Sequence, residues 1–225
     1  MVRRAAGAAG SPGPGGQRRR QRRHLRPALE AVAPLLEYPD GRLRRRAARA
    51  ARLVVSLDGE AARCLEAFAA AVRDASPAAL EERYTATFDL QPRCTPYVGY
   101  QLFGDSYARG SFLAYLAGRY REQGFACVGE LPDHVAVVLR FLARHPDALP
   151  PEFLPEALAP AVEKMHRSLA GGDNPYRLVL DALRRLIHAE TGVGADPGAE
   201  PVNGVAAAGS RWAGPNPRPG PAPAG

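Results

Sequence analysis

The chain has 225 residues, 30 of them Lys or Arg and 23 Asp or Glu, and this length is enough for one domain with a hydrophobic core. Eight arginines fall within residues 1–26, which hold no acidic residue, so the rest of the chain has 22 basic and 23 acidic residues. A nearly neutral body argues against a folded nucleic-acid-binding module, and no run of about 18 apolar residues could span a membrane. The three cysteines show no Cys-x-x-Cys spacing, which argues against a disulfide framework and a zinc knuckle. We expect a cytoplasmic protein with no stable membrane insertion, no specific nucleic-acid partner, and no metal or other cofactor.

Both ends of the chain differ in composition from the middle. Residues 1–26 combine arginine with glycine and proline, and their few apolar side chains cannot offset the entropy of ordering the segment. We predict a disordered, solvated arm, with unspecific binding to nucleic acid or anionic lipid as the alternative. Residues 191–225 are rich in glycine, proline and alanine and predict a disordered tail that contains the lone Trp212. The folded domain is therefore expected at 27–190.

Helical periodicity runs through this central part. Apolar residues recur every three to four positions, and Gly, Pro, Ser and Asn mark the segment ends. Helices are predicted at 27–38, 43–57, 60–72, 77–88, 107–123, 132–144, 153–169 and 176–187, with a further short apolar segment at 96–103. Because no segment alternates as a strand does, the predicted fold class is all-α, a single-domain bundle of about eight or nine helices.

Two of these helices carry local expectations that the structure can test. Pro132 is expected in the first turn of the helix 132–144, where Asp133 complements the positive end of the helix dipole and His134 has no local role. In the helix 107–123, Tyr107 is expected to face inward. Gly110 lies in the first half of that helix and costs stability there, so close packing against another backbone is expected to compensate.

Motifs of catalysis are missing from the sequence. It contains no Gly-x-x-x-x-Gly-Lys-Ser/Thr loop, no His-Glu-x-x-His and no Gly-x-Ser-x-Gly. His134 and His145 lie on one helix face but roughly 16 Å apart, which is too far to share a metal ion. Asp133 and His134 could form an acid/base pair in a helical hydrolase, but neighbours on a helix point about 100° apart. Binding is therefore the better prediction than catalysis.

Short motifs occur in a fixed order along residues 28–190. They are Leu35-Leu36-Glu37-Tyr38-Pro39-Asp40, Tyr84-x-x-x-Phe88-Asp89, Gly104-Asp105-x-x-x-Arg109-Gly110, Glu130-Leu131-Pro132-Asp133-His134 and Asn174-Pro175-Tyr176. In order and spacing they resemble the NarJ/TorD-type chaperones, which assist the maturation of molybdenum enzymes. The first motif and Leu131 favour the nitrate reductase branch, the nitrate reductase delta subunits. The arm and the tail have no counterpart in this pattern.

The resemblance implies an all-helical chaperone without catalytic activity. Its partner is implied to be the N-terminal peptide of the apo catalytic (alpha) subunit of respiratory nitrate reductase. The chaperone assists molybdenum cofactor insertion before membrane docking and is absent from the finished enzyme. By motif match, the peptide-binding role falls on Tyr84, Phe88, Asp105, Arg109, Glu130, Asp133 and His134. Core packing explains Tyr84 and Phe88 equally well, and helix capping explains Asp105 and Asp133 equally well.

Two other functions remain open from the sequence. In the same class, the chain could be a proofreading chaperone for an exported (twin-arginine) molybdoenzyme. In another class, it could bind nucleic acid through the basic arm, in which case binding would depend on salt and vanish on deletion of residues 1–26.

Overall fold

The structure is a computed structural model that describes residues 25–90, 94–191 and Trp212. The predicted arm at 1–26 lies outside the described residues except for Leu25 and Arg26. The predicted tail at 191–225 lies outside them except for Thr191 and Trp212.

The described residues form nine α-helices and no strand, which confirms the all-α prediction. Residues 25–32 are helical and lead into a 3-10 turn, Ala33–Leu35. The other helices are α2 (Leu43–Val54), α3 (Gly59–Ala71), α4 (Pro77–Tyr84), α5 (Val98–Phe103), α6 (Tyr107–Glu122), α7 (Val135–Arg144), α8 (Ala159–Ser168) and α9 (Tyr176–Thr191). Two π-helical turns, η2 (Thr85–Asp89) and η4 (Leu154–Leu158), continue α4 and precede α8. Over the described segments, no helix is long and apolar enough to cross a membrane.

Side-chain caps start several helices where the sequence predicts them. Asp58 Oδ1 accepts a hydrogen bond from Ala61 N (2.8 Å) and so starts α3. Ser76 Oγ accepts from Ala79 N (3.2 Å) and starts α4, with Pro77 in the first turn. The helix predicted at 43–57 already ends at Val54, and Leu57, the last residue of the predicted range, is 37% exposed.

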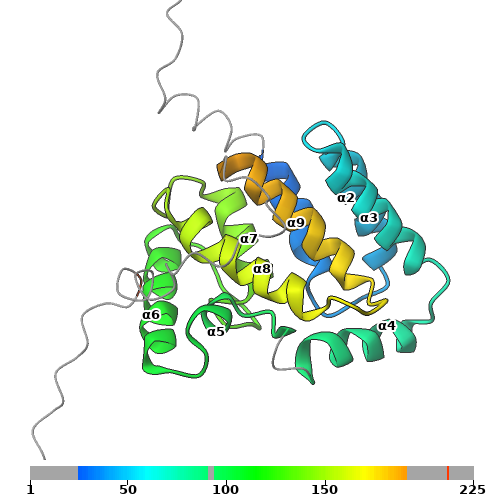
Figure 1. Ribbon diagram of the computed structural model, residues 1–225. Coiled ribbons are helices and arrows are strands. Elements are labelled where there is room, and N and C mark those ends of the chain that lie inside the picture. Colours follow the sequence, from blue (N-terminus) through cyan, green and yellow to red (C-terminus); the bar gives the residue numbers. More distant parts are fainter. Residues whose placement is uncertain (1–24, 91–93, 192–211, 213–225) are drawn as a thin grey trace, which may run out of the picture.

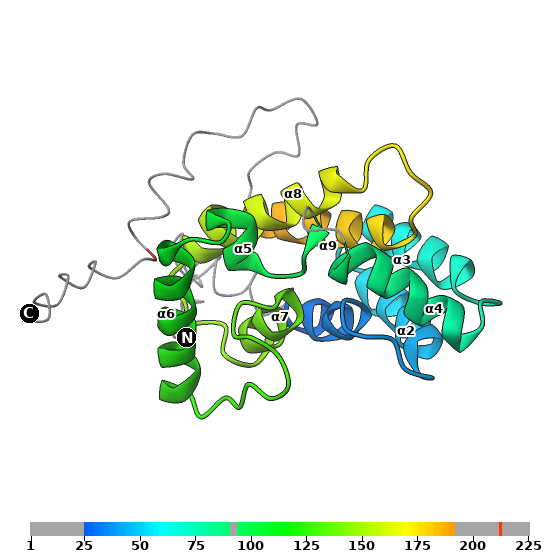
Figure 2. The ribbon, with the colours of Figure 1, turned by 90° about the horizontal axis from the view of Figure 1, so that it is seen from below.

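Helix α9 lies between α3 and α8, and α2 packs on α3 (Figure 1). Buried apolar residues recur along α9 at helical spacing, and they form the faces with which α9 packs against α3 and α8. Helices α5 and α6 lie at the opposite end of the molecule from α4 (Figures 1 and 2). α7 lies in the interior and is buried along most of its length.

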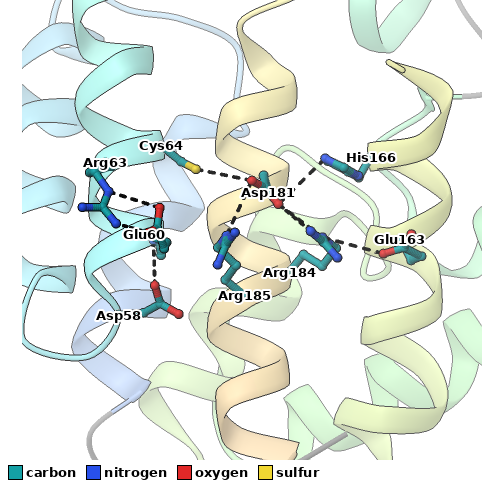
Figure 3. A network of polar contacts seen from close by, with 10 residues as sticks. Asp58, Glu60, Arg63, Cys64, Glu163, His166, Asp181, Arg184 and Arg185 are labelled. Carbon is teal, nitrogen blue, oxygen red and sulfur yellow. Dashed lines mark hydrogen bonds and ion pairs between the residues drawn. The ribbon is translucent and has the colours of Figure 1, made fainter. Parts of the chain in front are cut away.

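A polar contact at Asp181 joins the three helices α3, α8 and α9 (Figure 3). Arg184 Nη2 donates to Asp181 Oδ1 (2.8 Å), Cys64 Sγ of α3 donates to Oδ2 (3.4 Å), and His166 Nε2 of α8 lies 3.9 Å from Oδ1. Burial alone would raise the pKa of Asp181, but the hydrogen bonds from Arg184 and Cys64 outweigh it and lower that pKa. Burial and the Asp181 contact raise the pKa of Cys64 to about 11, so this thiol is protonated at neutral pH. The cluster holds helices together and offers no reactive group.

Candidate functional site

The central feature of the site is a short main-chain pairing between residues 96–98 and 133–135. Val135 N donates to Pro96 O (2.7 Å), and Val98 N donates to Asp133 O (2.8 Å). These bonds form an isolated antiparallel bridge between Tyr97 and His134. Backbone hydrogen bonds thereby join two segments that lie far apart in the sequence.

Asp133 and Arg109 form an ion pair beneath this pairing. Arg109 Nε lies 3.2 Å from Asp133 Oδ2, and the Asp133 side chain is fully buried. The Arg109 guanidinium carbon lies 5.4 Å from the ring centroid of Tyr97 and 5.5 Å from that of Tyr100, within cation–π range. Burial raises the pKa of Asp133, and the Arg109 hydrogen bond and charge oppose that rise. The motif residues Arg109 and Asp133 are thus brought together by the fold.

Gly99 makes room for this ion pair. A Cβ atom at Gly99 would lie 2.8 Å from Asp133 Oδ2, 2.9 Å from Phe112 Cδ1 and 3.3 Å from Arg109 Cγ. Such distances are too short for a side chain to fit without displacing its neighbours. The close packing predicted for Gly110 is wrong, because Gly110 is exposed and a Cβ there would meet nothing within 4 Å.

His134 is the N-cap of α7. Its Nδ1 accepts a hydrogen bond from Ala136 N (3.2 Å), so the neutral ring takes the role that Ser or Asp usually plays. The prediction that Pro132 lies in the first helical turn is therefore wrong, because α7 begins at Val135. Asp133 does not cap the helix either, since its carboxylate pairs with Arg109. His134 and Asp133 each have a structural partner, which argues against their use as an acid/base pair.

The His134 cap predicts a specific pH dependence. Burial, followed by the charge of Arg140, lowers the pKa of His134 to about 4 from 6.5. In the unfolded chain the ring takes up its proton near pH 6.5, so the stability that depends on the neutral ring is present above pH 6.5 and is lost as the pH falls to about 4. Over this interval we expect the wild type to lose about 3 kcal/mol more free energy of unfolding than His134→Asn, which can still cap but does not titrate. Urea unfolding followed by circular dichroism at a series of pH values measures this difference, and parallel pH profiles for the two proteins would contradict it.

Tyr97 connects the remaining parts of the site. Its hydroxyl lies 3.3 Å from Glu130 Oε2, and its ring meets that of His134 edge-on at 5.4 Å. Burial, together with the nearby carboxylates of Glu130, Asp133 and Asp89, raises the pKa of Tyr97 to about 12. The phenol is therefore protonated and donates to Glu130. Sequence reasoning missed Tyr97, although Tyr97 and Tyr100 are spaced three apart, as two aromatic rings that flank one cation can be.

Tyr84 and Phe88 lie in the core. Their exposed fractions are 4% and 1%, and their ring centroids are 4.9 Å apart. Tyr84 donates its hydroxyl hydrogen to Leu36 O (3.3 Å), and Phe88 packs edge-on against Tyr176 at 5.0 Å. The π-helical turn η2 carries Phe88 inward, whereas the next residue, Asp89, is exposed. Both aromatic side chains thus form the floor beneath a surface.

That surface, here called the acidic face, consists of exposed or half-buried residues around Tyr97. Its members are Tyr38, Glu81, Asp89, Leu90, Tyr97, Glu130 and Leu131. Asp89 lies within electrostatic reach of both Tyr38 and Tyr97, since its charge contributes to the raised pKa of each, after burial and their nearer carboxylates. Across the described part of the chain, no ion pair engages Glu81, Asp89 or Glu130. Among the described residues, the face therefore combines carboxylates that no ion pair engages with exposed apolar side chains.

Asp105 lies apart from this group. It is exposed in the turn that follows Gly104, whose φ of 62° favours glycine, and it precedes α6. Among the residues that the structure describes, no hydrogen bond or ion pair connects Asp105 to the acidic face. The expectation that Tyr107 faces inward is wrong, because its side chain is 59% exposed.

Within the same described residues, no group of three or more His, Cys, Asp or Glu side chains is arranged to hold a metal ion.

Over the described residues, the fold and the site define an all-helical protein whose surface around Tyr97 exposes carboxylates and apolar side chains. The same fold occurs in a putative redox enzyme maturation protein from Archaeoglobus fulgidus, with a TM-score of 0.50 and 24% identity over 74% of this chain and 93% of that chain. Residues 56–170 match the family described as nitrate reductase delta subunit, and the chain belongs to that family. The resemblance that the five motifs predicted is thereby confirmed.

Three curated proteins are similar to this chain. The nitrate reductase molybdenum cofactor assembly chaperone NarJ of Escherichia coli is 28% identical over 77% of this chain and 74% of its own length. The probable NarJ of Bacillus subtilis is 39% identical over 30% of this chain and 38% of its length. The nitrate reductase-like protein NarX of Mycobacterium tuberculosis is 36% identical over 51% of this chain, a match that spans only 17% of NarX.

Proposed function

We propose that this protein is a chaperone for respiratory nitrate reductase. It binds the N-terminal peptide of the apo catalytic subunit in the cytoplasm, assists molybdenum cofactor insertion before the enzyme docks at the membrane, and is absent from the completed enzyme. Family membership and the name of the E. coli relative support an assembly role. The absence of a free acid/base pair among the described motif residues is consistent with binding without catalysis.

The acidic face is the observation that carries the peptide-binding proposal. Exposed carboxylates beside Tyr38, Leu90 and Leu131 suit a peptide that has both basic and apolar side chains. Exposed carboxylates steer the peptide to the surface, and apolar side chains hold it there once it arrives.

The candidate residues then divide by their burial. Glu130 is a direct contact, and Arg109, with 18% of its side chain exposed, lies at the edge of the face. Tyr84, Phe88, Asp133 and His134 are buried and act as positioning residues that shape the face from below. Asp105 remains in the proposal as an outlying contact.

The proposal is tested with the double variant Asp89→Asn/Glu130→Gln, which removes two exposed charges with little change in side-chain size. We expect its affinity for a synthetic N-terminal peptide of the catalytic subunit to fall roughly 3- to 10-fold at low salt, and less at high salt, because exposed charges act through screened electrostatics. Isothermal titration calorimetry measures this change. Glu66→Gln on α3, also exposed and outside the face, is the matched control and is expected to bind like the wild type.

Co-purification from nitrate-respiring cells identifies the client. We expect the wild-type chain to capture catalytic subunit that lacks the molybdenum cofactor, and the double variant to capture less. Capture of an exported molybdoenzyme instead would favour the proofreading alternative. Salt-sensitive nucleic-acid binding that vanishes on removal of residues 1–26 would favour the third hypothesis.

A further inference from the structure

Trp212 packs on the helical part of the protein, although the composition of residues 191–225 predicts that it lies in a disordered tail. Its side chain is 2% exposed, and its ring centroid lies 5.5 Å from both Tyr115 of α6 and Phe153 next to η4. We call these two aromatic residues the indole seat. Tyr115 belongs to α6, which lies at one end of the molecule (Figure 2).

The seat suits a large flat ring. Trp212 meets Phe153 nearly edge-on, at 80°, and Phe153 in turn stacks parallel to Phe112 at 6.2 Å. Edge-on and offset contacts of this kind are the favourable arrangements for aromatic pairs. Tyr115 is only partly buried even with the indole in place, so without Trp212 the seat would be an apolar surface open to solvent.

Two terms oppose this packing. The indole Nε1 is buried and has no hydrogen-bond partner among the described residues, so it loses a bond that water would supply. In addition, Trp212 is separated from Thr191 by 20 residues of sequence, and chain entropy opposes fixing two such distant points on one body. Aromatic packing favours the docked state, whereas hydration of the indole and chain entropy favour release.

We propose that the indole seat is a reversible docking site and that its occupant is Trp212 of the same chain. Trp212 is thus a ligand of the folded domain. The assignment rests on the contacts of Trp212 alone and does not depend on the identity of the client.

Trp212 is the only tryptophan, so the fluorescence of the full-length protein reports directly on the seat. We expect native emission that is blue-shifted relative to the urea-unfolded protein and shielded from acrylamide. Tyr115→Ala is expected to shift the emission to the red and to increase quenching severalfold without loss of helical circular dichroism. Tyr107→Ala, on the exposed side of the same helix, is the matched control and should leave the emission unchanged. Native emission equal to that of the unfolded protein, or no response to Tyr115→Ala, would overturn the proposal.

A second experiment tests the seat with an added ligand. A synthetic peptide of residues 205–219 is titrated into full-length Trp212→Ala, in which the peptide supplies the only tryptophan. We expect a saturable blue shift that is lost in Tyr115→Ala/Trp212→Ala, and the absence of saturation would count against the seat.

Light scattering of the wild type distinguishes docking of Trp212 within one chain from docking between two copies of the chain. A monomer with concentration-independent emission supports docking within one chain, whereas a dimer with concentration-dependent emission would overturn that assignment.

Discussion

Replacing Arg109 with methionine is expected to lower the free energy of unfolding by about 3–5 kcal/mol, because the change leaves a buried charge without its partner. The Asp133 carboxylate is fully buried and lies 3.2 Å from Arg109 Nε. Methionine keeps much of the length of the arginine side chain, so the loss reflects the missing charge more than a cavity. Urea unfolding at pH 7 followed by circular dichroism measures it.

Two further measurements distinguish this cause from simple misfolding. The double variant Arg109→Met/Asp133→Leu removes both charges, and we expect it to recover most of the lost stability. In Arg109→Met alone the pKa of Asp133 rises further, since burial already raises it and Arg109 no longer opposes. The loss should therefore be full above that pKa and should shrink as the pH falls below it. A pH-independent loss that the second substitution does not repair would rule out the buried ion pair as its origin.

Phe88→Ala is also expected to cost about 3–5 kcal/mol in the free energy of unfolding, as is usual when a buried aromatic ring is truncated. Phe88 is 1% exposed and packs on Tyr84 and Tyr176 at 4.9 and 5.0 Å. Tyr107→Ala provides the contrast, since truncation of a tyrosine that is 59% exposed should change stability by less than about 0.5 kcal/mol.

The same variant decides whether Phe88 forms the floor of the acidic face or its contact surface. As a positioning residue, Phe88 should affect peptide affinity only in proportion to the loss of folded structure. Retained stability combined with lost peptide binding would show that Phe88 touches the peptide. Phe88 would then be buried in the free protein but in contact with the peptide in the complex. Thermal unfolding and peptide titration of the same protein sample provide both readouts.

Local periodicity was enough to predict the helices but not their ends at the site. Helix α9 followed from its apolar spacing, and Ser76 and Pro77 marked the start of α4 as predicted. The start of α7 was misplaced because histidine is not among the usual capping residues, and Asp133 in the neighbouring position looked like the better candidate. The order of motifs along the chain identified the family, because five weak patterns in sequence constrain one another.

The contacts that build the site could not be predicted, because they depend on tertiary structure. Tyr97 gains its role only when main-chain bonds bring residues 96–98 against 133–135. Close packing occurs at Gly99 rather than Gly110, and helix periodicity carries no information about which glycine meets another element. The composition of the neighbouring residues predicted that Trp212 lies in a disordered tail. Its position depends instead on contacts with aromatic rings on α6 and beside η4.

The pairing of residues 96–98 with 133–135 has a practical consequence for engineering. Its hydrogen bonds join peptide groups, so exchange of the outward side chains at Glu130 and Leu131 leaves these bonds in place. Libraries at those two positions could therefore retarget the protein to foreign peptide tags while the scaffold continues to fold.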